Sequence, residues 1–301
     1  MASLLRLGTR GSKLALVQAH ETKDRLGRVH AQLSAPDAVE IVTITTTGDS
    51  VQNRLLSEIG GKGLFTKEID EALLAGRVDI AVHSMKDLPT VLPDGIVIGA
   101  VLPREDPRDA LIGARRIADL PQGATLGTAS LRRAAQAKAL RPDLAIVPLR
   151  GNVDTRIRKI EAGEAKATML AVAGLKRLGL MESVGTPLEP EEMLPSVAQG
   201  AIAIACRAGD ERTLDLLAKI DDEPSRLRVT AEREMLAVLD GSCRTPIAGL
   251  AEIEGATLRL RGLVASVDGA RVDREERRGA AADAETIGRD LGAALKAAVA
   301  T

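Results

Sequence analysis

The sequence predicts an α/β fold of two α/β lobes followed by a smaller α+β domain at the C-terminus. Strand patterns alternate with helix patterns from the N-terminus onward, which is typical of a mainly parallel sheet. A charged segment flanked by prolines, "PREDPRD" at 103–109, indicates a boundary, and the alternation resumes after it. After about residue 222, a helix precedes three alternating segments, which predict a small antiparallel sheet.

In the first lobe, a strand runs into a turn and then a helix, for which Ser12 is the expected N-cap and Gly27 the expected stop. The β-branched residues of the next segment favour a strand. The expected elements are, in order, a strand in "LLRLGTR", a helix in "SKLALVQAHETKDRLG", a strand in "VEIVTITTTG", a helix in "TKEIDEALLAGRV", and buried strands in "DIAVHSM" and "GIVIGAV".

The second lobe repeats this alternation of strands and helices, whereas the last part of the chain has a helix followed by consecutive strands. The second lobe is expected to hold strands in "ATLGTA", "LAIVPLR" and "ATMLAVAGL" and helices in "SLRRAAQAKAL" and "VDTRIRKIEAGE". Another apolar run, "SVAQGAIAIACR", follows them. The C-terminal part is expected to hold a helix in "SRLRVTAEREMLAVL", strands in "PIAGLAEIEG", "TLRLRGLVAS" and "ARVDREERR", and a final helix in "ETIGRDLGAALKAAV".

The composition is that of a soluble globular protein and argues against several classes. The 301 residues suffice for about two or three domains, and the net charge of −1 gives no reason to expect a nucleic acid or a membrane surface as partner. No apolar run approaches the ~18–20 residues of a membrane span. Two cysteines and no signal-peptide pattern predict a cytoplasmic protein. The chain has no Trp, no Tyr and one Phe, so a protein that binds single-stranded nucleic acid by stacking aromatic side chains on its bases is not expected.

The segment 131–160 is strongly basic, with eight basic and two acidic side chains. Ser130 is the expected N-cap of a helix whose first turn holds Arg132 and Arg133. Because a helix start repels cations, two arginines there are easier to understand if they bind an anion. The alternative is a solvated basic face. The basic residues are Arg132, Arg133, Lys138, Arg141, Arg150, Arg156, Arg158 and Lys159.

Two further segments carry polar or special residues where a site is expected. "AVHSMKDLPT" places His83, Ser84, Lys86 and Asp87 after an apolar strand, at the carboxyl end where α/β proteins bind ligands. The alternative is an ordinary strand-to-turn exit. "GGKGLFTKE" reads as a Gly-rich lid before a helix, and its Phe65 can instead be a hydrophobic anchor for that helix. No metal site is expected, since His83 has no partner at ligand spacing.

The two cysteines lie in contrasting surroundings. Cys206, inside the apolar "AIAIACR", reads as a core residue. Cys243 lies in "VLDGSCRTPIAGL", where Gly and Pro on both sides indicate a loop, and beside Arg244. The sequence therefore places Cys243 where a reactant can reach it.

Nine stretches together resemble the porphobilinogen deaminase (hydroxymethylbilane synthase) family nearly from end to end. Each is weak alone, but nine in the right order are specific. They are "LGTRGSKLAL", "GGKGLF", "VHSMKDLP", "LPREDPRDALI", "GTASLRR", "PLRGNVDTRIRK", "LAVAGLKRLG", "VAQGAIAI" and "LDGSCRTPIAG".

The resemblance implies three domains. Two are periplasmic-binding-protein-like α/β lobes, at 1–102 with a return segment at about 201–220, and at 103–200. The third is an α+β domain at 221–301 that carries the cysteine loop.

The resemblance also implies a transferase of tetrapyrrole and heme biosynthesis. Such an enzyme deaminates four porphobilinogen molecules, joins them head-to-tail on a dipyrromethane cofactor and releases hydroxymethylbilane with ammonia. The cofactor would be attached to Cys243 through a thioether, which suits a nucleophilic thiolate. The family suggests a monomer.

The residue roles below are implied by the resemblance alone. Asp87 matches the catalytic carboxylate, and Phe65 matches a lid residue that can stack on a pyrrole. The matches to cofactor-binding residues are Cys243, Lys86, Ser84, Ser130, Arg132, Arg133 and Gly174. The matches to substrate-binding residues are Arg10, Ser12, Phe65, Arg150, Arg156 and Arg177.

The competing interpretation is a two-lobed binding protein for a small anion, without catalysis. It would not need a third domain that presents a cysteine. A thiol-dependent hydrolase is a weaker alternative, because no histidine lies near a plausible nucleophile motif.

Overall fold

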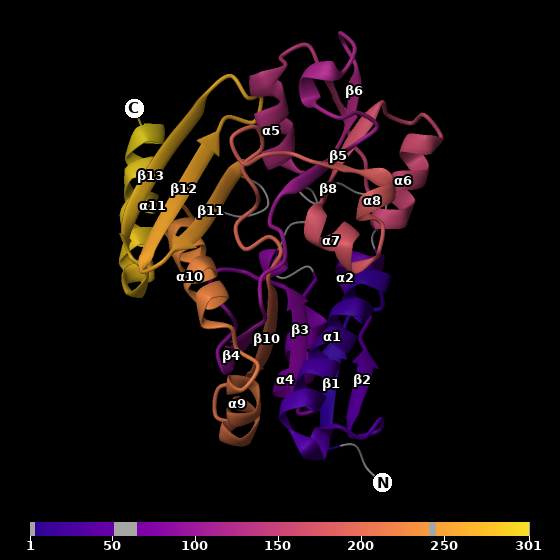
Figure 1. The fold of residues 1–301 in the computed structure, drawn as a ribbon, viewed down its shortest axis with the longest axis vertical. Helices are drawn as coiled ribbons and strands as arrows, with labels where there is room; N and C mark the ends of the chain where they lie inside the picture. The colour runs from indigo at the N-terminus through magenta and orange to yellow at the C-terminus, as the bar shows by residue number, and fades with distance from the viewer. Residues whose placement is uncertain (1–3, 51–64, 241–244, 301) are drawn as a thin grey trace. The chain divides into compact units, whose positions relative to one another are not determined.

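The computed structural model describes residues 4–50, 65–240 and 245–300 (Figure 1). These residues divide into two compact units. One unit holds residues up to 50, 65–105 and 201–226, and the other holds 106–200 and the described residues after 226. Among these residues, no helix is both long and apolar enough to cross a bilayer. The division into three domains stays a prediction.

The first unit is built on a five-stranded sheet in which four strands point the same way. Its order is β2-β1-β3-β10-β4. β1 is parallel to β2 and β3, whereas β10 is antiparallel to β3 and β4. The strands are β1 (Leu5–Thr9), β2 (Val39–Thr43), β3 (Ile80–Ser84), β4 (Ile96–Val101) and β10 (Ile202–Arg207).

The helices of this unit follow local sequence signals. Ser12 caps α1 (Lys13–Val29) by accepting a hydrogen bond from the Ala15 N–H. The predicted stop at Gly27 is wrong, because α1 continues to Val29; a Cβ at Gly27 would lie 3.3 Å from the Leu33 carbonyl oxygen, so the glycine instead permits close packing. The other helices are α2 (Thr47–Ser50), α4 (Lys67–Leu74) and α9 (Glu211–Ala218), with 3₁₀ turns at Ala31–Leu33 and Met85–Asp87.

The two faces of the first sheet pack against different helices. Ile80 and Val82 of β3 pack in a cluster with residues of α1 and α9, and Ala81 packs on the other face with residues of α4. Cys206 is fully buried in the first cluster, and burial raises the pKa of its thiol to about 11. The interpretation of Cys206 as a core residue is confirmed.

The second unit holds a sheet with the same arrangement. Its order is β7-β6-β8-β5-β9, and β5 is the strand that runs against its neighbours. β5 begins at Asp109, the last residue of the predicted boundary segment. The strands are β5 (Asp109–Ile112), β6 (Thr125–Gly127), β7 (Ala145–Val147), β8 (Ala167–Ala171) and β9 (Thr186–Pro187).

Helices follow three of these strands at their carboxyl ends. The prediction of one strand through "ATMLAVAGL" is wrong at its end, because β8 stops at Ala171, where its pairing with β5 stops, and α7 begins at Val172. The helices are α5 (Leu131–Leu140), α6 (Val153–Glu161), α7 (Val172–Arg177) and α8 (Met181–Val184), with a 3₁₀ turn at Ile117–Asp119.

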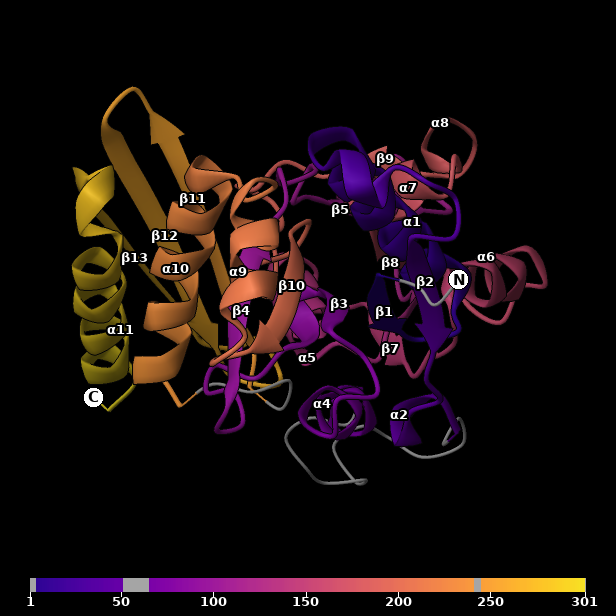
Figure 2. The ribbon, with the colours of Figure 1, turned by 90° about the horizontal axis from the view of Figure 1, so that it is seen from below.

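The C-terminal part is the predicted antiparallel sheet with helices on one face. β11 (Ile247–Glu254), β12 (Thr257–Ala265) and β13 (Val272–Ala280) pair in sequence order. Figure 2 shows α10 (Glu223–Val238) and α11 (Ala284–Ala300) beside this sheet, and a 3₁₀ turn at Ala281–Asp283 leads into α11. The opposite face packs on α5 through Ala135, Ala248 and Leu263. The predicted class of two α/β lobes plus a smaller α+β part at the C-terminus is confirmed.

Candidate functional site

Polar residues meet at the carboxyl edge of the first sheet. β1 and β3 are parallel neighbours, so Arg10 after β1 and Lys86 and Asp87 after β3 belong to the same edge. The Arg10 guanidinium carbon lies 4.3 Å from the centroid of the Phe65 ring, a cation–π contact. The structure thus brings together two predicted site residues that are far apart in sequence.

Ser84 and Ser12 have structural partners at this edge. The Ser84 hydroxyl hydrogen-bonds with the side-chain amide of Gln18 on α1, whose Nε2 lies 2.9 Å away. Ser12 accepts a hydrogen bond of 3.3 Å from the Ala15 N–H. These bonds fix the start of α1 against the end of β3, and a contact of either hydroxyl with a ligand stays a prediction.

His83 is the buried member of the polar group at the end of β3. It is 5% exposed, and no hydrogen-bond partner is found for its Nε2 within the described part of the chain. Burial, with the nearby charge of Arg10, lowers the pKa of His83 to about 4. The imidazole is therefore neutral at pH 7.

The lowered pKa of His83 predicts a pH-dependent stability. Between about pH 6.5 and pH 4 the unfolded chain binds a proton at His83 that the folded chain does not, so stability falls as pH falls through this window. The full effect is about 3 kcal/mol. We expect His83→Gln to lose less unfolding free energy than the wild type between pH 7 and pH 4.5, measured by urea titration. Equal losses in the two proteins would contradict this assignment.

The second lobe carries its predicted residues at the corresponding edge. Ser130 follows β6, Arg150 follows β7, and Gly174 and Arg177 lie on α7 after β8, and these three strands are parallel. Ser130 caps α5 as predicted by accepting from the Arg133 N–H. Asn152 caps α6 in the same way, accepting from the Thr155 N–H. Each of these two caps fixes the backbone beside an arginine.

Arg132 and Arg133 already hold an anion that belongs to the protein. Both residues are 6% exposed, which rules out a solvated basic face for these two residues. Arg132 Nη1 lies 2.7 Å from one oxygen of Asp109, and Arg133 Nη2 lies 2.7 Å from the other. Burial alone would raise the pKa of Asp109, but the two guanidinium groups hold it well below its usual range.

The role of Asp109 was not predicted, although one signal for it was present in the sequence. In "PRDALI" a carboxylate directly precedes an apolar strand. A fully buried aspartate requires a cationic partner, so the strand assignment would have implied one. That inference needs β5, which the alternation pattern did not reveal.

Arg150 and Arg177 differ in whether their guanidinium N–H groups have hydrogen-bond partners among the described residues. Nη1 of Arg150 is buried, and no hydrogen-bond partner is found for it over residues 4–50, 65–240 and 245–300. Both terminal nitrogens of Arg177 donate to the Gly200 carbonyl at 3.2 Å. Because buried polar atoms are normally paired, the Arg150 donor suits the carboxylate of an anionic ligand, and Arg156 on α6 adds a second guanidinium to this segment.

Cys243 lies outside the described residues. The elements that flank it are α10, which ends at Val238, and β11, which begins at Ile247. Within the described ranges, no group of three His, Cys, Asp or Glu side chains could hold a metal ion.

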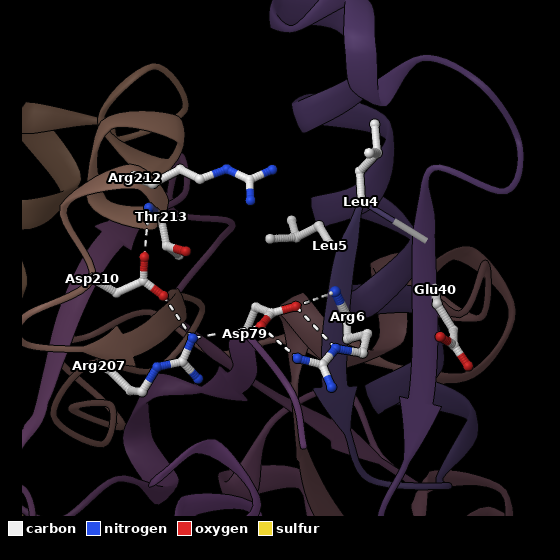
Figure 3. A pocket seen from close by; sticks show the side chains of 9 residues that line it. All are labelled: Leu4, Leu5, Arg6, Glu40, Asp79, Arg207, Asp210, Arg212 and Thr213. Carbon is white, nitrogen blue, oxygen red and sulfur yellow. Dashed lines mark hydrogen bonds and ion pairs between the residues drawn. The ribbon is translucent and has the colours of Figure 1, made fainter. Parts of the chain in front are cut away.

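A pocket of about 610 Å³ lies in the first lobe at the opposite edge of the sheet (Figure 3). Its charged groups are largely paired with one another: Arg6 with Asp79 at 2.9 Å, and Arg207 with Asp210 at 2.6 Å. The pocket lies where β1 and β3 begin, whereas Arg10 and Asp87 follow the ends of these two strands. Its lining residues are Leu4, Leu5, Arg6, Glu40, Asp79, Arg207, Asp210, Arg212 and Thr213.

Comparison with known families decides what these residues belong to. Residues 5–215 match the family model described as porphobilinogen deaminase, dipyromethane cofactor binding domain, and residues 226–297 match that of the porphobilinogen deaminase C-terminal domain. The chain belongs to the porphobilinogen deaminase family. The resemblance seen in the nine sequence stretches is confirmed.

Curated porphobilinogen deaminases are similar over nearly the whole chain. That of Paracoccus denitrificans is 58% identical, covering 97% of this chain and 93% of the relative. The chloroplastic one of Oryza sativa is 54% identical, covering 92% and 78%. Among solved structures, an arginine-specific periplasmic binding protein of Salmonella typhimurium is 14% identical, covering 73% of this chain and 92% of that one, with a TM-score of 0.39.

As a porphobilinogen deaminase, the protein is a transferase of tetrapyrrole and heme biosynthesis. It deaminates porphobilinogen, joins four molecules on a dipyrromethane cofactor and releases hydroxymethylbilane. The alternative of a small-anion binding protein without catalysis is not favoured.

Proposed function

We propose that Asp87 is the catalytic carboxylate of this deaminase. The observation that carries the proposal is its place in a short turn at the carboxyl end of β3, held by a 3.0 Å hydrogen bond from the Met85 N–H to the Ala201 carbonyl. Asp87 is partly exposed there, so a substrate can reach it. Arg10, which contacts Phe65, follows the parallel neighbour β1 at the same edge of the sheet.

The chemistry of deamination explains why a carboxylate suits this position. Loss of ammonia from porphobilinogen leaves positive charge on the pyrrole ring, delocalised to its N–H. A carboxylate fixed beside that N–H stabilises the charged ring more than the neutral ring, which lowers the barrier. Asp87 can also accept a proton and return it as successive pyrrole rings exchange roles during elongation.

The residues proposed to hold the cofactor fit its chemistry. Dipyrromethane carries acetate and propionate groups, and when bound it supplies the free carbon to which pyrroles are added. Cys243 would attach it through a thioether. Lys86 would neutralise a carboxylate, and Ser84, Ser130 and the segment around Gly174 would add hydrogen bonds. Arg132 and Arg133 would bind carboxylates with donors beyond those that Asp109 uses.

The substrate-binding residues are proposed by the same reasoning. Each porphobilinogen brings two carboxylates, so the growing chain becomes strongly anionic. Arginine binds carboxylates with two parallel hydrogen bonds, which orients as well as attracts them. The proposed contacts are Arg10, Ser12, Arg150, Arg156 and Arg177, with Phe65 stacking on a pyrrole.

Arg150→Met tests this assignment most sharply. Since Nη1 of Arg150 has no partner in the described chain, removing it should leave the melting temperature unchanged or raised. Removing a carboxylate partner in a closed site should cost on the order of 2–5 kcal/mol of ligand binding. We expect a rise in KM for porphobilinogen or accumulation of a partly grown chain, measured by steady-state kinetics and intact mass.

The matched control is Arg158→Met, which removes an exposed arginine from the neighbouring helix α6. It should change neither KM nor the distribution of chain lengths. If the two variants behave alike, Arg150 is not a substrate contact.

The general proposal is tested by mass and colour. Protein that carries dipyrromethane should show the corresponding mass increment and react with an acidic aldehyde reagent for pyrroles. It should also release ammonia from porphobilinogen. A small-anion binding protein would show none of the three.

We also infer that the protein is a cytoplasmic monomer. Two cysteines in 301 residues suit a reducing compartment, and the family resemblance suggests a single chain. Sedimentation equilibrium should return a mass close to 31.6 kDa, and twice that value would contradict the monomer.

A further inference from the structure

Asp109 is the centre of a fully buried polar cluster. Its exposed fraction is 0%, and both carboxylate oxygens are engaged. Oδ2 accepts from Arg132 Nη1 at 2.7 Å. Oδ1 accepts from Arg133 Nη2 at 2.7 Å and from Gln199 Nε2 at 2.9 Å. The single carboxylate therefore sets the positions of two guanidinium groups at once.

Each arginine has a second anchor in the second lobe. Arg132 Nη1 also donates to the Leu194 carbonyl at 2.9 Å, and Arg133 Nη1 donates to the Met169 carbonyl at 2.7 Å. These contacts together fix the orientation of each guanidinium group. The cluster also holds two positive charges against the one negative charge of Asp109, so a ligand carboxylate would complete its charge balance.

Gln199 is itself held on both sides. Its Nε2 donates to Asp109 and to the Pro107 carbonyl, the latter at 2.8 Å. The preceding residue, Ala198, has a φ of 58°, a left-handed conformation that non-glycine residues adopt only when their surroundings impose it. The surroundings impose it here through Glu232, whose Oε2 accepts from the Ala198 N–H at 2.6 Å.

Glu232 connects this loop to the elements on either side of the Cys243 loop. Glu232 lies on α10, is fully buried, and its Oε1 accepts from the Ala251 N–H of β11 at 2.7 Å. The Cys243 loop joins α10 to β11 in the sequence. Buried hydrogen bonds thus connect these two elements to Ala198, and those of the next residue in the chain, Gln199, connect it to Asp109.

We propose that Asp109, Gln199 and Glu232 form a positioning network. It holds Arg132 and Arg133 in fixed places relative to α10 and β11, the elements that carry the loop of the cofactor cysteine. Arg132 and Arg133 thereby keep a fixed position relative to the two elements that flank the cofactor cysteine in the sequence. The inference rests on the proposed function, in which these arginines bind cofactor carboxylates.

The principal variants are Asp109→Asn, which keeps the shape and removes the charge, and Gln199→Met, which keeps the volume and removes the donor to Asp109. We expect both to lower the fraction of purified protein that carries the dipyrromethane mass, Asp109→Asn by more than tenfold. The molecules that are loaded should show a higher KM for porphobilinogen. If Asp109→Asn fails to fold, Gln199→Met decides the question alone.

Asp79→Asn is the matched control. Asp79 also lies between two arginines, at 2.9 Å from Arg6 and 3.5 Å from Arg207, but at the amino edge of the first sheet. Its loss should lower the melting temperature without changing cofactor loading or KM. If Asp109→Asn and Gln199→Met do the same, the network only stabilises the fold and the proposal is overturned.

Variants of the arginines separate this proposal from the function on which it rests. If Arg132→Met and Arg133→Met load cofactor normally, their proposed role as cofactor binders fails. If they load poorly, adding Asp109→Asn to the double variant Arg132→Met, Arg133→Met should cause little further loss, because Asp109 acts through both arginines. Fully additive losses would mean that Asp109 acts on its own.

Discussion

Cys243→Ser should yield protein that lacks the dipyrromethane mass and has essentially no activity. A serine hydroxyl is a far weaker nucleophile than a cysteine thiolate near neutral pH, so the thioether has no counterpart that forms under the same conditions. Intact mass spectrometry measures the loading, and ammonia release from porphobilinogen measures the activity. This is the largest effect that we expect from a single substitution.

Cys206→Ser is the control. Cys206 is fully buried in the core of the first lobe, and its pKa of about 11 keeps the thiol protonated. The variant should lose some stability, because a hydroxyl is buried in apolar surroundings, but it should keep both the cofactor mass and the activity. The reverse pattern would assign the cofactor to the wrong cysteine.

Asp87→Asn should slow deamination by roughly 10²–10³-fold, the typical cost of removing one electrostatic group from a reaction centre. Asparagine keeps the shape and can still accept one hydrogen bond, but it lacks the charge. Asp87→Glu keeps the charge, displaced by one methylene, and should retain much more activity. The measurement is single-turnover ammonia release from protein already carrying its dipyrromethane, which separates the chemical step from cofactor assembly.

Asp94→Asn, at an exposed aspartate in the loop before β4, controls for the change of net charge and should release ammonia at the wild-type rate. Near-normal release from Asp87→Asn would make Asp87 a positioning residue. The positive charge on the pyrrole would then have to be stabilised by another group.

Most elements of the fold were predictable from the sequence because their signals are local. The cap at Ser12, the strand–helix alternation of both lobes and the three alternating segments near the C-terminus all correspond to observed elements. The predicted end of α1 at Gly27 was wrong because glycine occurs both at the ends of helices and inside them where another segment packs closely. Only the packing of Leu33 against α1 distinguishes them.

The candidate site was predictable only in part. The carboxyl-end positions of Asp87, Ser130 and Arg150 follow from strands that the sequence reveals, although their roles rest on the family resemblance. The stacking of Arg10 on Phe65 and the pairing of Ser84 with Gln18 depend on segments more than fifty residues apart. Local patterns carry no information about such contacts.

What the sequence by itself determined is most of the strands and helices and, through the nine stretches, the resemblance to the family. What only the tertiary structure decided is how the basic segment is held. β5 and β10 are each inserted against the direction of their neighbours, and each pairs with strands far away in the sequence. That insertion brings Asp109 between Arg132 and Arg133. A buried charge needs its counter-charge in space rather than in sequence, so the pairing could be found only once the chain was folded.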